Sequence, residues 1–291
     1  MPARNKPPMK FGLFSVLTAT ALLAGCAVGP DYARPSATLP EDYSQAPEAR
    51  AAAPVNPEWW MLFGDSGLNA LVQQALDANQ DLQAAIARLE AAEAVTREAG
   101  AAYYPAVDLG AATSRQGTSG VTYNGQRIGG ATYDNRRAAL SLSYEVDLWG
   151  RIRRQNEAAG AEALASRFAR DSVRLALIGQ VANEYLTLRS HDAEVAVSQE
   201  TVTSRENTLR IVQARLDAGS SSALELAQAE NSLATAQSQL SQLKRLRALS
   251  ENQIALLTGQ PGLRIPPNLT PLPLPPVPPA GLPSTLLEAR P

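Results

Sequence analysis

Residues 202–226 read VTSRENTLRIVQARLDAGSSSALEL, and they contain the end of one predicted helix, a turn and the start of the next helix. One apolar position recurs every seventh residue, at Val202, Leu209 and Leu216. This is the spacing of a helix that packs along a neighbouring helix. The pattern stops at 217–222, where Gly219 can adopt the left-handed conformation that ends a helix and Ser221 or Ser222 can cap the next one. The sequence therefore predicts two antiparallel helices that reverse direction at 217–222.

Both helices of this hairpin are predicted to be long, over 151–258 in total. The first repeats apolar residues at Ala161, Leu164, Phe168, Leu175, Ile178, Ala182 and Tyr185, and every seventh residue from Val181 through Leu188 and Val195. The second repeats them at Leu226, Ala229, Leu233, Ala236, Leu240, Leu243, Ile254 and Leu257, with Arg247 and Ser250 as interruptions. At 1.5 Å per residue the helices would span about 100 Å and about 50 Å, too long for a compact globular domain. A supercoiled hairpin is predicted, and a plain coiled-coil spacer is an alternative interpretation.

Composition and motifs argue against several classes of protein. The 26 basic and 28 acidic residues give a formal net charge of −2, and no basic patch indicates nucleic acid as a partner. One histidine and one cysteine argue against a histidine-based metal site and a disulfide framework. Ser241 and Lys244 have the spacing of a serine–lysine pair but lie within the helical repeat, and His191 is predicted to be a solvated surface residue. With no phosphate-binding loop and no nucleophile elbow, we expect no enzyme and no cofactor.

Residues 1–25 have the layout of a bacterial export signal. Three basic residues precede an apolar run at 11–23 that is too short to span a bilayer. Leu23-Ala24-Gly25-Cys26 matches the bacterial lipobox, so we expect Cys26 to carry a diacylglyceride and an N-linked palmitate after cleavage. Ala27 follows, where an aspartate would retain a lipoprotein in the inner membrane. The sequence therefore predicts an acyl anchor in the outer membrane.

The segments on either side of the hairpin differ in character. Residues 26–65 are rich in proline, alanine and small polar residues and are predicted to form an extended tether. Trp59 and Trp60 are expected to pack against the start of a helix predicted over 66–104, which Asp65 or Ser66 can cap and Pro105 stops. Residues 259–291 are predicted to be a proline-rich linker that leads into another helix.

The apolar period changes from helical to two within residues 105–150. Apolar Leu140, Leu142, Tyr144, Val146 and Leu148 alternate with Ser141, Ser143, Glu145 and Asp147. A weaker alternation covers 106–114, so we expect strands at 106–114 and 139–148 and an outward loop at 114–135. The wall of a membrane barrel needs such strands, with one apolar and one polar face. A half-buried strand of a soluble sheet would look alike.

Taken in order, these features resemble one family, the TolC-like outer membrane factors, in their lipoprotein branch of the NodT or OprM type. The resemblance is carried by Cys26-Ala27-Val28-Gly29-Pro30-Asp31-Tyr32, the segments 60–71 and 75–82, Tyr104-Pro105-Ala106, Tyr144-Glu145-Val146-Asp147-Leu148-Trp149-Gly150-Arg151, the turn region 215–226 and Gly281-Leu282-Pro283-Ser284. It implies a mainly α fold with a β-hairpin. In this family a homotrimer builds a twelve-stranded barrel, and its paired helices build a periplasmic tunnel.

The resemblance also implies a function. The chain would be an outer-membrane channel subunit of a tripartite efflux system in a Gram-negative bacterium, a passive conduit for drugs or other small molecules. Its partners would be a periplasmic adaptor, an inner-membrane RND transporter and outer-membrane lipid. The turn at 217–222 would be the periplasmic tip, and Arg215, Leu216, Gly219 and Ser222 would dock the adaptor. Alternatively, Gly219 and Ser222 only shape the turn.

The resemblance covers only the first of the family's two structural repeats, so we expect the chain to be a fragment of a longer protein. Two other functions remain open. One is a lipid-anchored periplasmic coiled-coil scaffold without a pore, and the other is the channel of a type I protein secretion system. The paired period-two strands favour a channel, because a scaffold does not need them.

Overall fold

A computed structural model describes residues 29–35, 57–117, 120–271 and 275. The predictions for the export signal, for Cys26, for 36–56 and for the helix near the C-terminus lie outside these residues. The chain forms two compact units. One contains 29–35 and 90–165, and the other contains 57–89 and 166–271.

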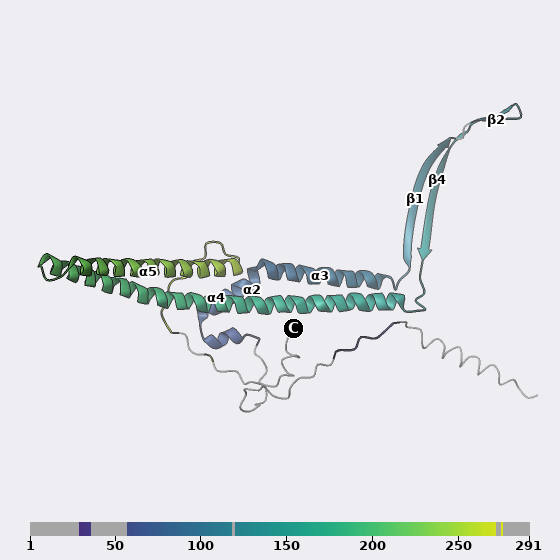
Figure 1. Ribbon diagram of the computed structural model, residues 1–291. Helices are drawn as coiled ribbons and strands as arrows, with labels where there is room; N and C mark the ends of the chain where they lie inside the picture. The colour runs from purple at the N-terminus through teal and green to yellow at the C-terminus, as the bar shows by residue number, and fades with distance from the viewer. Residues whose placement is uncertain (1–28, 36–56, 118–119, 272–274, 276–291) are drawn as a thin grey trace, which may run out of the picture. The chain divides into compact units, whose positions relative to one another are not determined.

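The helical hairpin consists of α4 (Arg151–Asp217) and α5 (Ala223–Leu257), which lie side by side up to the turn (Figure 1). Gly219 adopts a φ of 74°, in the left-handed region that the turn requires. The Ser222 hydroxyl accepts a hydrogen bond from the Glu225 amide at 3.2 Å and so caps α5. The turn therefore lies where the sequence predicts it.

The seven-residue repeat describes the packing of α4 on α5 well. Val202 of α4 is buried with Ala236 and Leu240 of α5, and Val195 and Leu233 pack against them. Three apolar positions predicted to be buried near the start of α4, Leu164, Phe168 and Leu175, are about half exposed. The reason is length, since α5 has 35 residues and α4 has 67, so α5 can cover only part of α4.

The helix predicted over 66–104 is in fact two helices, α2 (Ser66–Ala78) and α3 (Gln80–Ala101). Asn79 breaks it, with an extended backbone (φ −69°, ψ 127°). Its side-chain oxygen accepts from the Leu82 amide at 3.0 Å, and its amide nitrogen donates to the Leu257 carbonyl at 3.0 Å. Asn79 thus caps the start of α3 and satisfies the end of α5 with one buried side chain.

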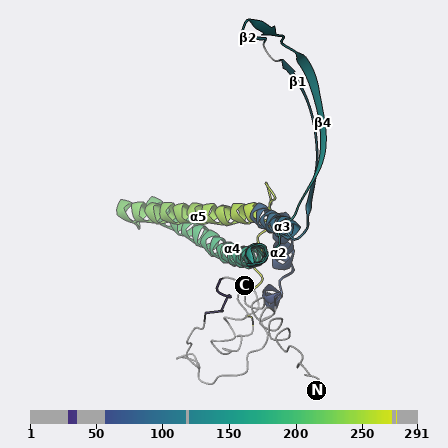
Figure 2. The same cartoon turned by 90° about the vertical axis from the view of Figure 1, so that its right-hand side faces the viewer.

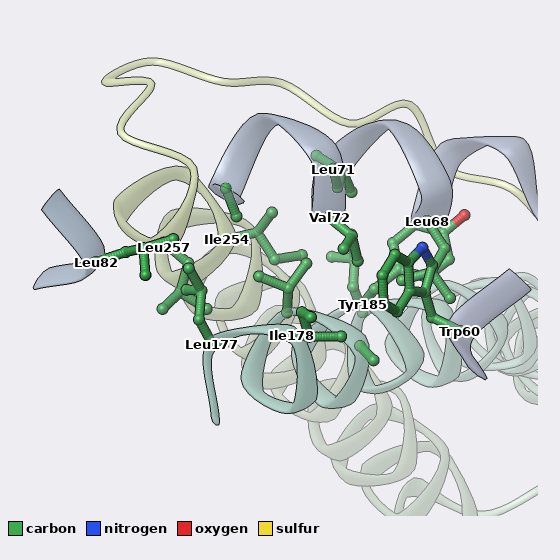
Figure 3. Close-up of a cluster of buried hydrophobic side chains, with 14 residues drawn as sticks. Trp60, Leu68, Leu71, Val72, Leu82, Leu177, Ile178, Tyr185, Ile254 and Leu257 are labelled. Atoms are coloured by element: carbon green, nitrogen blue, oxygen red, sulfur yellow. The ribbon is translucent and has the colours of Figure 1, made fainter. Parts of the chain in front are cut away.

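The main hydrophobic core joins α2 and the first turn of α3 to α4 and α5 (Figure 3). A short 3₁₀ helix, η1 (Trp59–Phe63), stands where the sequence predicts an extended tether, and it brings Trp60 into this core. Trp59 packs edge-on against Trp60 and Phe63, with ring centroids 6.4 Å apart in each pair. The predicted packing role of the two tryptophans is therefore confirmed.

Asp65 links the start of α2 to α4. One of its carboxylate oxygens accepts from the Gly67 and Leu68 amides at 2.7 and 3.0 Å, which confirms it as the predicted cap. The other oxygen accepts from the Tyr185 hydroxyl at 2.9 Å. Burial, and then the neighbouring Asp65 carboxylate, raise the pKa of Tyr185 to about 12. Tyr185 therefore stays a neutral donor at physiological pH.

The two predicted strands pair as an antiparallel hairpin of β1 (Ala106–Gly117) and β4 (Thr132–Ser143), which Figure 2 shows as a long two-stranded ribbon. Both strands extend further than predicted into the expected loop 114–135. That region also holds β2 (Val121–Tyr123) and β3 (Gln126–Ile128), which pair across a tight turn at Asn124 and Gly125.

The strand predicted over 139–148 is wrong at its end, because β4 stops at Ser143. The acidic residues of that stretch, Glu145 and Asp147, form hydrogen bonds with the start of α4. Arg151 donates to Glu145 at 2.9 and 2.6 Å, and the Arg153 amide donates to Asp147 at 2.9 Å.

Among the helices that the structure describes, none is long and apolar enough to cross a membrane.

Candidate functional site

The β1–β4 hairpin has two faces of opposite character. In the register of the pair, Val107 lies opposite Leu142, Leu109 opposite Leu140 and Ala111 opposite Ala138. Residues opposite each other share a face of the sheet, so these six side chains form one apolar face. The other face carries Asp108 opposite Ser141, Gly110 opposite Ala139 and Ala112 opposite Arg137. The alternation in the sequence therefore corresponds to two different faces of the sheet, one apolar and one that carries the polar residues.

The apolar face of the hairpin is uncovered. Val107, Leu109, Leu140 and Leu142 are 63 to 78% exposed. A soluble chain rarely leaves a contiguous apolar patch in water, so such a patch marks an interaction surface. A two-stranded hairpin is also marginally stable by itself and leaves both outer edges open to further strands. The geometry calls for an apolar environment on one face and for neighbouring strands at the edges.

Exposed aromatic residues gather in sequence at the base of this hairpin. Tyr103 and Tyr104 precede β1, and Tyr144 and Trp149 follow β4. We call these four residues the aromatic base of the hairpin. In the same segment Arg151 holds Glu145 in a bidentate pair, and its hydrogen bonds lower the pKa of the Glu145 carboxyl. Tyrosine and tryptophan side chains at the ends of apolar strands are typical of the boundary between lipid and water.

Arg154, near the start of α4, binds the segment that follows Cys26 in sequence. Its guanidinium donates to the Asp31 carboxylate at 2.8 Å and to the Gly29 carbonyl at 3.4 Å. It also pairs with Glu157 at 2.8 Å. Residues 29–31 are therefore tied to the part of the chain that follows the hairpin.

The four residues predicted for the helical tip lie together around the turn. The carbonyl of Arg215 accepts from Ser220, and the carbonyl of Leu216 accepts from Gly219, at 2.8 Å each. Nothing lies within 4 Å of a Cβ placed on Gly219, so that glycine is needed for its φ and not for space. The Arg215 side chain is exposed, and within the described ranges no carboxylate pairs with it. The structure thus gives Gly219 and Ser222 a role in the turn and leaves Arg215 available.

A buried polar cluster is the main feature that sequence reasoning missed. We call it the linker clamp; it consists of Arg189 and Asp192 of α4 and Arg247 and Glu251 of α5. Asp192 is 3% exposed and accepts from Arg247 at 2.6 Å. The interruption noted at Arg247 therefore lies on the apolar face because it meets an acid there. The signal was present, since Asp192 lies four residues after Leu188 and three before Val195, on the repeat itself.

The linker clamp binds the backbone of the proline-rich segment 263–271. Glu251 accepts from the Ile265 amide at 2.7 Å, and Arg247 donates to the Ile265 carbonyl at 2.6 Å. Asp192 accepts from the Asn268 amide at 3.1 Å, and Arg189 donates to the Thr270 carbonyl at 2.5 Å. Pro266 and Pro267 prevent this segment from satisfying its own backbone in a helix, so side chains do so instead.

His191 and Ser241, two polar residues singled out in the sequence, make contacts within their own helices. His191 is half-buried, and its Nδ1 lies 3.1 Å from Glu194, so its prediction as a solvated residue is wrong in part. Ser241 donates to the Gln237 carbonyl of its own helix at 2.9 Å. Over the described residues, no three histidine, cysteine, aspartate or glutamate side chains gather in a way that would hold a metal ion.

The sequence matches the family model described as outer membrane efflux protein over residues 71–260. It is 33% identical to the probable efflux pump outer membrane protein TtgC of Pseudomonas putida, in a match that covers 97% of this chain and 60% of that protein. It is 31% identical to the nodulation protein T of Rhizobium leguminosarum bv. viciae, over 82% of this chain and 48% of that protein.

Solved structures of outer-membrane channels are also similar to this chain. The outer-membrane channel OprN matches with a TM-score of 0.77 and 28% identity, over 91% of this chain and 60% of that one. CusC, described for transmembrane channel formation, matches with a TM-score of 0.74 and 26% identity, over 90% and 58%. The chain thus spans about half to three fifths of the length of these relatives. It belongs to the outer membrane efflux protein family.

Proposed function

We propose that this chain is a channel subunit of the outer membrane that exports small molecules as part of a tripartite efflux system. One observation carries the proposal: a hairpin with one exposed apolar face and one polar face is followed directly in the chain by a long helical hairpin. Lipid would cover the apolar face, and water in the pore would cover the polar face. TtgC, an efflux pump outer membrane protein by name, supports the same reading. The proposal includes no catalytic step.

Neighbouring strands must close the barrel, because an open sheet edge in lipid would leave backbone groups without partners. β1 and β4 supply two strands, and further strands would come from other copies of the chain in a homotrimer and from sequence corresponding to the rest of the longer relatives. Because the matched relatives are longer, the pore itself is a property proposed for the whole protein.

Conductance tests the function. The protein, purified from outer membranes and added to planar bilayers, is expected to give stepped conductance. A protein that binds the bilayer but gives no steps would overturn the channel and favour the periplasmic scaffold. Accumulation of an exported polypeptide, and not of small molecules, in a deletion strain would instead favour the channel of a type I secretion system.

We propose that Cys26 anchors the chain through covalent acyl groups. Cys26 lies outside the described residues, but it is only three positions before Gly29 in the sequence, and three positions of chain reach about 10 Å at most. Gly29 and Asp31 are held by Arg154, close in sequence to the aromatic base of the hairpin. An anchor there would enter the same boundary between lipid and water as those aromatic side chains.

Replacing Cys26 with alanine is expected to abolish acylation and to lower membrane retention, because no other thiol is present in the chain. Incorporation of radioactive palmitate measures the first effect, and fractionation of membranes measures the second. Replacement of Arg34 with alanine, in the segment that follows the cysteine, is the control and should keep the label. Persistent label in the Cys26→Ala protein would rule out the anchor.

We propose that the turn between α4 and α5 docks a periplasmic adaptor through Arg215, Leu216, Gly219 and Ser222. Reversing the charge with Arg215→Glu is expected to weaken adaptor binding about tenfold, since a reversed charge at an interface opposes association. Adaptor capture and drug susceptibility measure it, at unchanged protein abundance. Arg210→Glu, an exposed arginine of the same helix, is the matched control. Equal effects of the two variants would argue against a specific role of Arg215.

A further inference from the structure

The apolar face of the β1–β4 hairpin ends in charged residues on that same face. After the three apolar pairs, Thr113 lies opposite Arg136, and Arg115 lies opposite Asp134. Arg137, the next residue, lies opposite Ala112 on the polar face. Two adjacent arginines thus point to opposite sides of one strand. The change from apolar to charged along one face is abrupt, as expected where a strand passes from lipid into water.

The length of the apolar face fits a bilayer. From Tyr144, at the aromatic base, to Arg136 is a step of eight residues, or about 27 Å along an antiparallel strand. A strand tilted by about 40° would cross about 20 Å in that distance, close to the apolar band of about 25 Å on outer-membrane barrels. If the tyrosine lies at one boundary of the hydrocarbon, Arg136 lies at the other, where an arginine costs little.

The two arginines of this face differ in their partners. Arg115 pairs with Asp134 at 3.6 Å, so its charge is partly compensated. Within the part of the chain that the structure describes, no carboxylate lies within ion-pair distance of Arg136, and its side chain is exposed. A guanidinium binds phosphate oxygens in a bidentate manner, and phosphate is the charged group at a lipid surface.

We infer that Arg136 binds the phosphate of a lipid headgroup at the boundary of the hydrocarbon that lies farther from the aromatic base. This inference rests on the proposed function, because it requires β1 and β4 to be membrane strands. It adds a partner that the pore itself does not require. Arg136 fixes how deep the hairpin sits, and Arg137 faces the water-filled side and takes no part.

Lipid binding tests this inference directly. The purified protein in neutral detergent is titrated with phosphatidylglycerol that carries a fluorophore on one acyl chain. An arginine near an anionic lipid surface contributes about 1 kcal/mol, which corresponds to about fivefold in affinity. Arg136→Ala should therefore bind the lipid about fivefold more weakly, and Arg137→Ala, the matched control one residue away on the other face, should bind like the unchanged protein. Arg136→Lys should retain part of the affinity.

The outcomes separate the possibilities. Equal loss in Arg136→Ala and Arg137→Ala, or no loss in either, would overturn the inference. Displacement of the lipid by free inorganic phosphate would assign Arg136 to a soluble phosphate instead and would also overturn it. Conductance is measured on the same samples: steps that persist in Arg136→Ala without loss of lipid affinity would refute the lipid contact and leave the channel intact. Absence of steps in the unchanged protein would refute the channel itself.

Discussion

Replacing Arg247 with alanine is expected to lower the free energy of unfolding by about 3–5 kcal/mol, the usual cost of removing one partner of a buried ion pair. The Asp192 side chain is 1% exposed, and the Arg247 side chain is 15% exposed. Without the guanidinium, the Asp192 carboxylate would stay buried beside the Asn268 amide with its strongest partner gone. The carbonyl of Ile265 would lose its donor as well.

Urea unfolding followed by circular dichroism measures this effect. Arg245→Ala is the matched control, because Arg245 is exposed on the same helix and donates only to Gln242 of its own helix. Its stability should stay within about 0.5 kcal/mol of the unchanged protein. If Arg247→Ala unfolded at the same urea concentration as Arg245→Ala, the linker clamp would not hold the segment 263–271.

An apolar replacement of the pair would recover only part of the loss. A double variant, Asp192→Leu with Arg247→Met, removes both charges and so avoids an unpaired ion. It also removes the partners of the Ile265 carbonyl and the Asn268 amide, and the loss of each part-buried hydrogen bond costs about 0.5–1.5 kcal/mol. The linker clamp is thus more than an ion pair, because its side chains also hydrogen-bond the backbone of a segment that prolines keep out of regular structure.

The long helices and their turn were predictable because their signals are local. The seven-residue repeat through Val202 and the serine cap at Ser222 act within a few residues of sequence, and the structure shows both. The break at Asn79 was missed although part of its cause is local, because asparagine is a favoured N-cap and its side chain accepts from the Leu82 amide three residues on. The other part is tertiary, since the same side chain donates to the Leu257 carbonyl, 178 residues away. The apolar pattern is compatible with a helix on both sides of Asn79 and so did not indicate the break.

The difference between local and tertiary signals also explains which parts of the β1–β4 hairpin were predicted correctly. Period-two alternation gave its two faces correctly, and the pairing of β1 with β4 confirms them. The end of β4 was placed too late, because Glu145 and Asp147 alternate like strand residues but serve Arg151 and the amide of Arg153. The pattern of polar residues alone does not tell a side chain that faces water from one that holds the next helix.

Replacing Leu140 with arginine is expected to prevent assembly in the outer membrane. Leu140 lies opposite Leu109 in the middle of the apolar face and is 73% exposed, so the change removes little packing within the chain. In lipid, an arginine near the midplane costs about 2–4 kcal/mol, or about 30-fold to 1,000-fold in the folded and inserted population of each chain. The amount of protein recovered from purified outer membranes measures the loss.

Ser141→Arg is the control that makes this result decisive. Ser141 is the next residue, on the polar face, and lies opposite Asp108, which would pair with the new arginine. Membrane levels of this variant should match those of the unchanged protein, because its side chain would stay in water. If Leu140→Arg assembled as well as Ser141→Arg, then no lipid would cover the apolar face, and the hairpin would belong to a periplasmic scaffold. A loss confined to Leu140→Arg would support hydrocarbon on that face, because Leu140 is largely exposed within the chain.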